Sequence, residues 1–282
     1  MNLKAATPRH VTPHLAGRVG RIDVVHQQVV VATAGTDAAA QTLHYDRLLL
    51  AAGSRLNCPP IPGLQQRAFN VDQIADAARL QAHLQGLAER AQSAARNTVV
   101  VAGAGFTGIE TAAEMPVRLR EVLGADAAVN VILDERAEAL GPDLGEGPRP
   151  VITQALTELG VSWRLGSGVA RVDAEGMTLE SGERIGAATV IWTAGARASA
   201  LTKQVPSQHD AVGRLHVDRT LKAKGVDAVF ATGDCAHAAT DDEGNVAMMS
   251  CQHAMNLGRS AGHNAAADLL GEAMIDYAQP ST

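Results

Sequence analysis

The chain has 282 residues, of which 46% are hydrophobic, 19% charged and 2% aromatic, and its formal net charge is −6. That length supports a sizeable core in one large or two ordinary domains, while the negative charge and so few aromatic side chains argue against nucleic acid and anionic membranes as partners. The apolar runs are too short to cross a bilayer, the first ten residues lack a secretory signal, and three widely spaced cysteines suit a reducing compartment, so we expect a cytoplasmic protein.

The first part of the chain has the pattern of short β-strands. Two β-branched runs lie within residues 18–33 and are split near His26, and a turn signal follows at residues 34–37. The apolar run 48–52 then ends at Gly53. So short and apolar a run suits a parallel strand that is buried on both faces. A rigid proline-rich connection follows, and we expect the first domain boundary there.

A long amphipathic helix is expected after this connection. Asp72 is a suitable N-cap, because its side chain can accept a hydrogen bond from the first turn. Apolar residues then recur at helical spacing, namely Ile74, Ala77, Leu80, Leu84, Leu87 and Ala91. The pattern predicts a helix that packs on the core.

The next apolar strand, residues 98–102, leads directly into Gly103-Ala104-Gly105-Phe106-Thr107-Gly108, and a helical pattern follows. In a dinucleotide-binding fold, Gly103 makes the tight turn, Gly105 lets the backbone approach a pyrophosphate, and Gly108 lets the helix pack closely. The start of the helix offers unpaired N–H groups to phosphates. The context predicts dinucleotide binding; the alternative is a glycine-rich turn of another α/β protein.

An acidic pair, Asp134 and Glu135, ends the following apolar strand, which is expected over residues 128–133. An ionised carboxylate there accepts hydrogen bonds from ribose hydroxyls and repels a 2′-phosphate, which favours NAD over NADP. Glu135 is the first choice for this role and Asp134 the second. Arg136 leaves room for NADP, and a solvated strand end is the alternative for both acids.

Two residues of the helix after the glycine motif carry separate expectations. Glu110 lies two residues past Gly108, and we expect it in the first helical turn. It either complements the helix dipole or faces the nicotinamide end of a cofactor, and the sequence favours neither. Pro116 lacks the N–H that would bond back to Ala112, so we expect the helix to kink or end there.

The middle of the chain alternates helix, short strands and glycine turns. Residues 151–159 predict a helix with Gly160 at its C-cap, and a meander of short strands is expected between residues 161 and 185. Another buried strand, residues 189–194, ends at Gly195, near which the second domain boundary is expected. The order of elements predicts an α/β fold with a largely parallel sheet and an inserted meander.

The last part of the chain contains one more strand that ends in glycine. Residues 229–232 run into Gly233 and Asp234, so this carboxylate stands where α/β sheets bind ligands, although a helix N-cap is the alternative. A final helix is expected from about Gln252 to about Leu270. The Asp-Cys-Ala-His spacing at Asp234 is too weak for a metal site, and no serine has the context of a hydrolase nucleophile.

Four blocks in this order and spacing resemble the pyridine nucleotide-disulfide oxidoreductases, which are flavoproteins with two dinucleotide-binding domains, and within them type II NADH dehydrogenases. The blocks are residues 45–54, 103–110, 190–195 and 230–236. The resemblance implies a Rossmann-like NAD-binding domain inserted into an incomplete FAD-binding domain with a β-meander. The implied NAD-binding domain spans residues 63–195, and the parts of the FAD-binding domain span residues 1–62 and 196–282.

The resemblance also implies roles for individual residues. NADH would be held by Gly103, Ala104, Gly105, Phe106, Thr107, Gly108, Glu135 and Gly195. Glu110 would be the catalytic residue near the nicotinamide and the flavin. FAD would be held by Gly53, Gly233, Asp234, Gln252, His253 and Ala254, where a positive helix end stabilises the anionic reduced flavin. A hydride would pass from NADH to FAD, and the electrons then to an acceptor such as a quinone.

The chain departs from this family in its first segment. Its only Gly-x-Gly-x-x-Gly begins at Gly103, and the last helix has Asn256 four residues after Gln252 where the quinone-linked enzymes have a second glutamine. We therefore expect a flavin-dependent NADH oxidoreductase that lacks its first flavin-binding segment, or an NAD(H)-binding module without redox turnover. The strand ending at Ala52 would lose its neighbours and expose an apolar edge, so we expect self-association into a homo-oligomer.

Overall fold

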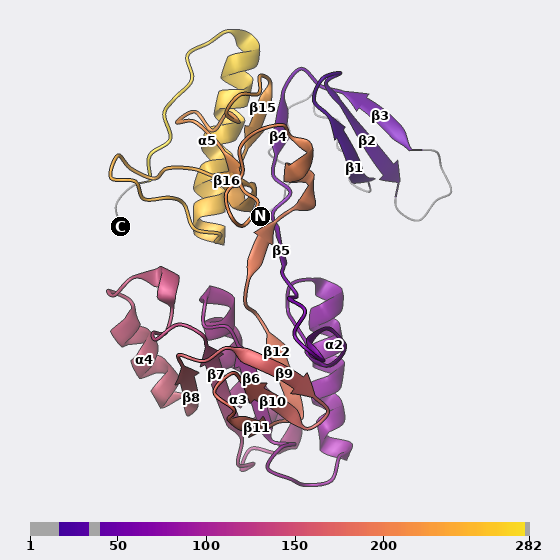
Figure 1. Ribbon diagram of the computed structural model, residues 1–282, viewed down its shortest axis with the longest axis vertical. Coiled ribbons are helices and arrows are strands. Elements are labelled where there is room, and N and C mark those ends of the chain that lie inside the picture. Colours follow the sequence, from indigo (N-terminus) through magenta and orange to yellow (C-terminus); the bar gives the residue numbers. More distant parts are fainter. Residues whose placement is uncertain (1–16, 34–39, 280–282) are drawn as a thin grey trace. The chain divides into compact units, whose positions relative to one another are not determined.

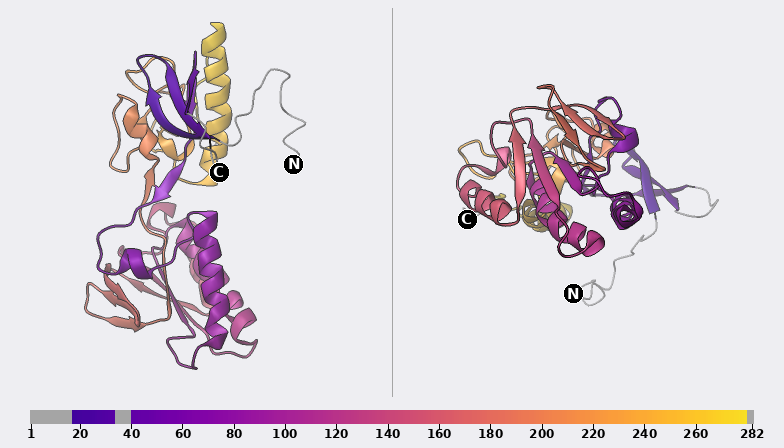
Figure 2. Two further views of the ribbon diagram at one scale, coloured as in Figure 1. Left: turned by 90° about the vertical axis from the view of Figure 1, so that its right-hand side faces the viewer. Right: turned by 90° about the horizontal axis from the view of Figure 1, so that it is seen from below.

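The computed structural model describes residues 17–33 and 40–279, which form two compact units (Figures 1 and 2). The continuous unit is Ser54–Arg197, and the split unit combines the described residues up to Gly53 with those from Ala198 onward. The domain boundaries expected after residues 62 and 195 stay predictions. The turn expected at 34–37 and the first ten residues lie outside the described residues.

The continuous unit is built on a four-stranded parallel sheet with the order β12-β6-β7-β8. Its strands are β6 (Thr98–Ala102), β7 (Asn130–Glu135), β8 (Val161–Leu165) and β12 (Thr189–Trp192). All five residues of β6 are buried. This apolar run therefore lies between two layers, as its composition predicts for a central parallel strand.

Successive side chains of these strands point to opposite faces of the sheet. One face packs with the helices α2 (Ile74–Gln85), η2 (Gly86–Glu89), α3 (Phe106–Leu123) and α4 (Arg149–Glu158). The other face packs with the short helix α1 (Leu64–Arg67) and the antiparallel meander β9 (Val169–Asp173), β10 (Gly176–Leu179) and β11 (Arg184–Gly186). The helix expected at 151–159 is confirmed, although its C-cap is Leu159 and not Gly160. The meander is confirmed from residue 169 onward, whereas residues 161–165, which were expected to belong to it, form β8 of the parallel sheet. The fold class is α/β.

Two local predictions for the helices need correction. Helix α3 does not end at Pro116 but runs through it to Leu123, because Met115, Pro116 and Leu119 are all buried and their packing outweighs one lost hydrogen bond. A kink at Pro116 stays a prediction. The N-cap of α2 is Gln73, not Asp72. Asp72 instead accepts a hydrogen bond from the backbone N–H of Leu56 at 3.2 Å.

The split unit contains an antiparallel sheet and two small parallel pairs. The sheet is β1 (Gly17–Asp23), β2 (Gln28–Thr33) and β3 (Gln41–His44). The parallel pairs join β4 (Leu48–Leu50) to β15 (Val229–Ala231) and β14 (Leu215–His216) to β16 (Ala236–His237). They share a core with helix α5 (Cys251–Leu270), which confirms the expected final helix.

The remaining short elements connect these layers. They are β5 (Ser54–Leu56) paired with β13 (Ala196–Ala198), and the 3₁₀ turns η3 (Pro142–Leu144), η4 (Ala200–Gln204) and η5 (Gly233–Cys235). Within residues 17–33 and 40–279, no helix combines the length and the apolar character needed to span a membrane.

Candidate functional site

The turn that leaves β6 can be made only by glycine at its first position. Gly103 has a φ of +108°, and a β-carbon there would lie 2.8–2.9 Å from Ala194, which follows β12. The Gly103 N–H donates to the backbone oxygen of Asp134 at 2.8 Å, which ties the turn to the end of β7. Tight packing on both sides therefore fixes where the chain leaves the sheet.

The other two glycines of the motif, Gly105 and Gly108, differ in what surrounds them. A β-carbon at Gly108 would lie 1.7 Å from the backbone oxygen of Gly103, so glycine lets α3 pack against the turn. A β-carbon at Gly105 would meet no atom within 4 Å. Gly105 is the N-cap of α3, and no side chain caps this helix. The start of α3 thus presents backbone N–H groups, a ready site for phosphate.

Glu135 is held against the glycine turn. One carboxylate oxygen accepts from the backbone N–H of Ala104 at 2.7 Å, and the other accepts from the N–H of Ala137 at 3.0 Å. The side chain is half-buried. A carboxylate has about four acceptor positions, so Glu135 can still accept hydrogen bonds from a diol placed beside the turn.

Asp134 lies on the opposite face of β7 and takes no part in this arrangement. It is 2% exposed, and its Oδ1 has no hydrogen-bond partner among the described residues. Burial raises the pKa of this carboxyl to about 7, and the charges of Glu135 and Glu183 act in the same direction. Of the two acids that the sequence offered for a ribose, the structure brings only Glu135 to the turn.

Thr193 is part of the site, although sequence reasoning missed it. Its hydroxyl contacts the backbone oxygens of Ala102 and Gly103 at 3.0 and 2.9 Å, so it braces the turn from the end of β12. A threonine after an apolar strand gives no signal in the sequence. Gly195 follows with a φ of +82°, and its backbone oxygen accepts from Asn57.

The position of Glu110 differs from its prediction. It is the fifth residue of α3, and the first turn of this helix contains no acidic residue. The side chain is exposed. The reading in which Glu110 complements the helix dipole from the first turn is therefore wrong, because the dipole acts mainly within that turn. Its role beside a nicotinamide stays a prediction.

In the split unit, two predicted flavin-site glycines end the paired strands β4 and β15. Leu50 pairs with Ala231, and beyond them Gly53 and Gly233 have φ values of +64° and +56°. The Cys235 thiol donates to the Gly53 oxygen at 3.4 Å, which holds the two turns together. A β-carbon at Gly53 would meet no atom within 4 Å. Asp234 lies within the 3₁₀ turn η5 and does not cap a helix.

The start of α5 packs against this turn, because a β-carbon at Gly233 would lie 3.4 Å from Ala254. Ser250 is the N-cap, and its hydroxyl oxygen accepts from the His253 N–H and lies 2.9 Å from the ring nitrogen Nδ1. Burial lowers the pKa of His253, so the ring is neutral at pH 7. The structure therefore brings Gly53, Gly233, Asp234 and the predicted residues at the start of α5 to one end of the split unit.

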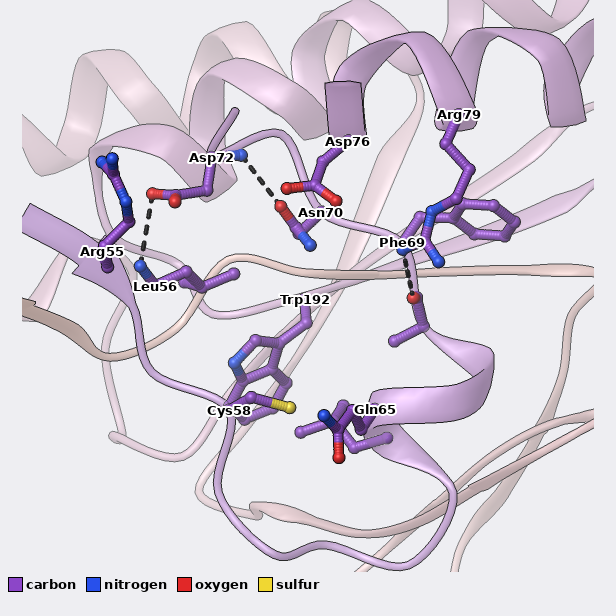
Figure 3. A pocket seen from close by; sticks show the side chains of 12 residues that line it. Arg55, Leu56, Cys58, Gln65, Phe69, Asn70, Asp72, Asp76, Arg79 and Trp192 are labelled. Carbon is purple, nitrogen blue, oxygen red and sulfur yellow. Dashed lines mark hydrogen bonds between the residues drawn. The ribbon is translucent and has the colours of Figure 1, made fainter. Parts of the chain in front are cut away.

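The hollow in Figure 3 lies elsewhere in the continuous unit, among α1, α2 and the end of β12. Its volume is about 320 Å³, and Arg79 stacks over Phe69 at 5.2 Å on one wall. None of the predicted site residues lines it. The charged lining residues are Arg55, Asp72, Asp76 and Arg79. Their formal charges cancel, so the hollow favours no charged ligand class.

Across the described ranges, no group of three or more His, Cys, Asp and Glu side chains gathers closely enough to hold a metal ion.

An open glycine turn after a central parallel strand, with a carboxylate from the next strand beside it, is the arrangement of a Rossmann-like α/β fold. The chain belongs to the pyridine nucleotide-disulphide oxidoreductase family, which matches residues 6–258. The resemblance found in the sequence is thus confirmed. This oxidoreductase family uses FAD and NAD(H), the two cofactors expected from the sequence.

Individual relatives agree with this assignment. The chain is 46% identical over 264 residues to an NADH dehydrogenase-like protein of Mycobacterium tuberculosis, covering 93% of the chain and 64% of that relative. It is 27% identical to a type II NADH:quinone oxidoreductase of Staphylococcus epidermidis, covering 83% of the chain and 61% of that relative. The chain thus spans less than two thirds of the length of these relatives.

The fold agrees with a solved structure. A FAD-dependent pyridine nucleotide-disulphide oxidoreductase from Desulfovibrio vulgaris superposes with a TM-score of 0.68 at 24% identity. The superposition covers 93% of this chain and 63% of that one. At this identity the likeness shows the fold alone.

Proposed function

We propose that the chain is the NADH-binding part of a flavin-dependent NADH oxidoreductase that delivers electrons to a quinone. The observation that carries this proposal is the position of Glu135, whose carboxylate is held beside an open glycine turn by the N–H groups of Ala104 and Ala137. A carboxylate at this point suits the two ribose hydroxyls of NADH and opposes the extra phosphate of NADPH.

The continuous unit would hold the dinucleotide by two groups. The N–H groups after Gly105, at the uncapped start of α3, would bind the pyrophosphate. Glu135 would bind the adenosine ribose. Gly105 has no packing role of its own, because its missing β-carbon leaves only open space. This space is what a pyrophosphate needs for close approach to the backbone.

The split unit would supply the flavin-facing residues. Gly53, Gly233, Asp234 and the start of α5 meet at one end of this unit. Thr232 there has a buried hydroxyl with no partner among the described residues, a group that a bound ligand could satisfy. These residues would hold FAD at this end, and the flavin would supply the transfer of electrons from NADH to an acceptor.

The acceptor, location and assembly belong to the same proposal. A quinone is favoured because a relative at 27% identity is named a type II NADH:quinone oxidoreductase.

We place the protein in the cytoplasm, where NADH is available. Self-association is favoured at β4, which among the described strands pairs with β15 alone. Size-exclusion chromatography over a range of concentrations tests the assembly.

Cofactor titrations test the nucleotide assignment. We expect saturable NADH binding and NADPH binding weaker by about tenfold or more, because a lost hydrogen bond to a charged group costs about 1.5–3 kcal/mol. Equal affinity, or tighter binding of NADPH, would contradict the role of Glu135.

A visible spectrum and an assay with added FAD and a water-soluble quinone test the redox assignment. NADH oxidation that requires both additions supports the oxidoreductase. A chain that binds NADH but never binds FAD or turns over would instead be an NAD(H)-binding module.

A further inference from the structure

Arg136 leaves the choice between NADH and NADPH open in the sequence. It follows Glu135 directly, and an arginine near this point can accommodate a 2′-phosphate. Glu135 therefore favours NADH, whereas Arg136 favours NADPH. In the structure, Arg136 is engaged by Glu180, which follows strand β10 of the meander, with 3.4 Å between Nη2 and Oε1.

The backbone holds this ion pair in place from both sides. Residues 136–138 and 166–168 follow the neighbouring parallel strands β7 and β8, so they lie at the same carboxyl edge of the sheet. The N–H of Gly166 donates to Ala137, and the N–H of Glu180 donates to Gly168 at 2.7 Å. The loop that carries Arg136 and the turn that carries Glu180 are thus both fixed to the short segment between them.

Gly168 provides the space for the pair. A β-carbon at this position would lie 2.9 Å from Arg136 Nε and 2.9 Å from an oxygen of the Glu180 carboxylate. The two side chains therefore cross directly over the glycine. Both are largely exposed, so a ligand can reach the guanidinium, but it must compete with Glu180 for it.

We propose that Glu180 is a specificity-determining residue, which strengthens the preference for NADH by holding Arg136 away from a 2′-phosphate. It acts through Arg136 and so is a positioning residue. A nucleotide with a 2′-phosphate must displace the Glu180 carboxylate to gain the arginine, whereas NADH needs neither group. The inference rests on the proposed function, in which the glycine turn and Glu135 bind the adenosine end.

The test compares Glu180→Gln with the parent chain by titration with NADPH and NADH. Exposed ion pairs are weak, so we expect NADPH to bind about fivefold more tightly while NADH affinity changes less than twofold. The ratio of the two affinities is a readout that a general loss of stability would not move. Glu180→Asp, which keeps the charge, should restore most of the preference.

Glu183→Gln is the matched control. Glu183 is also an exposed meander glutamate, but it pairs with Arg164 at 2.9 Å. Its substitution removes the same charge without freeing Arg136 and should leave both affinities unchanged. The double variant Glu180→Gln with Arg136→Ala should lose the gain for NADPH.

Three results would overturn this inference and leave the proposed function intact. They are an equal gain in Glu183→Gln, a gain that persists without Arg136, and an unchanged NADPH affinity in Glu180→Gln. If the parent chain shows no saturable NADH binding, the proposed function fails, and this inference fails with it.

Discussion

In each of the two units, a buried parallel strand is followed by a glycine with positive φ. The units differ in the structure that this glycine leads into. After Gly103 the chain enters the 18-residue helix α3, whose start no side chain caps. Gly233 itself begins a three-residue 3₁₀ turn, and the helix that packs there, α5, is capped by its own Ser250. A glycine at a strand end thus makes a turn, but an anion site also needs free helix N–H groups and an open approach.

This difference predicts unequal cofactor binding by the two units. Among its described residues, the split unit offers a carboxylate, two glycine turns and a capped helix start. We expect the isolated chain to bind NADH yet to purify colourless or with much less than one FAD per chain, and to oxidise NADH slowly. The described part of the split unit has no second glycine turn that leads into an uncapped helix start, which we call a glycine cradle. Without such a cradle, FAD affinity should fall by several factors of ten, each about 1.4 kcal/mol.

Flavin absorbance of the purified chain and its NADH oxidation rate measure this prediction. Stoichiometric yellow FAD with rapid NADH oxidation would contradict it. That result would mean that the split unit holds the flavin without a glycine cradle of its own.

The cradle itself can be broken at Gly105. In Gly105→Val the side chain would fill the open space before α3, so we expect saturable NADH binding to disappear, a loss of more than about 100-fold or about 2.7 kcal/mol. The fold should survive, because a β-carbon there meets no protein atom within 4 Å. Gly147→Val is the control, since that glycine is equally open and lies outside the turn. Wild-type affinity in Gly105→Val would refute the phosphate assignment.

The buried Asp134 carboxyl should make the stability of the fold depend on pH, even without a bound nucleotide. Burial raises its pKa to about 7 in the folded chain. Between about pH 4 and about pH 7 the unfolded state ionises first, so the stability conferred by the neutral carboxyl is lost as the pH rises. Relative to Asp134→Asn, the free energy of unfolding of the wild type should therefore fall by up to about 4 kcal/mol between about pH 4 and about pH 7.

Denaturant unfolding at several pH values measures that difference. Asp173→Asn is a control of opposite sign, because the bond from Arg184 lowers the pKa of Asp173. The stabilisation by Asp173 is constant above about pH 4 and is lost only as the pH falls below that value. Parallel curves for the wild type and Asp134→Asn would show that Asp134 is ionised in the folded chain.

A smaller effect on nucleotide affinity tests the ribose contact by itself. Glu135→Ala should weaken NADH about tenfold, or about 1.4 kcal/mol, and should weaken NADPH less, because it also removes the repulsion of a 2′-phosphate. Glu138→Ala changes an acid of the same loop that lies over Gly166 and should leave both affinities unchanged. Isothermal titrations with both nucleotides decide between these outcomes.

The local sequence was sufficient to predict structure where one short segment contains the whole motif. The strand, glycine turn and helix at residues 98–108 were predictable because the apolar run, the three spaced glycines and the helical pattern follow one another directly in the sequence. At Pro116 the local rule could not tell that α3 continues to Leu123. The effect of this proline on α3 depends on the burial of Met115 and Leu119, which the local rule does not count.

The sequence by itself determined the α/β fold, the family and the nucleotide turn. It could not choose between Asp134 and Glu135, because β7 is apolar on both faces and its pattern shows no alternation that would mark the outer side. Only the tertiary structure decided this, by placing the meander over Asp134 and the glycine turn beside Glu135. It also paired Arg136 with Glu180, 44 residues away. Such a contact depends on how separate layers pack, which local spacing does not encode.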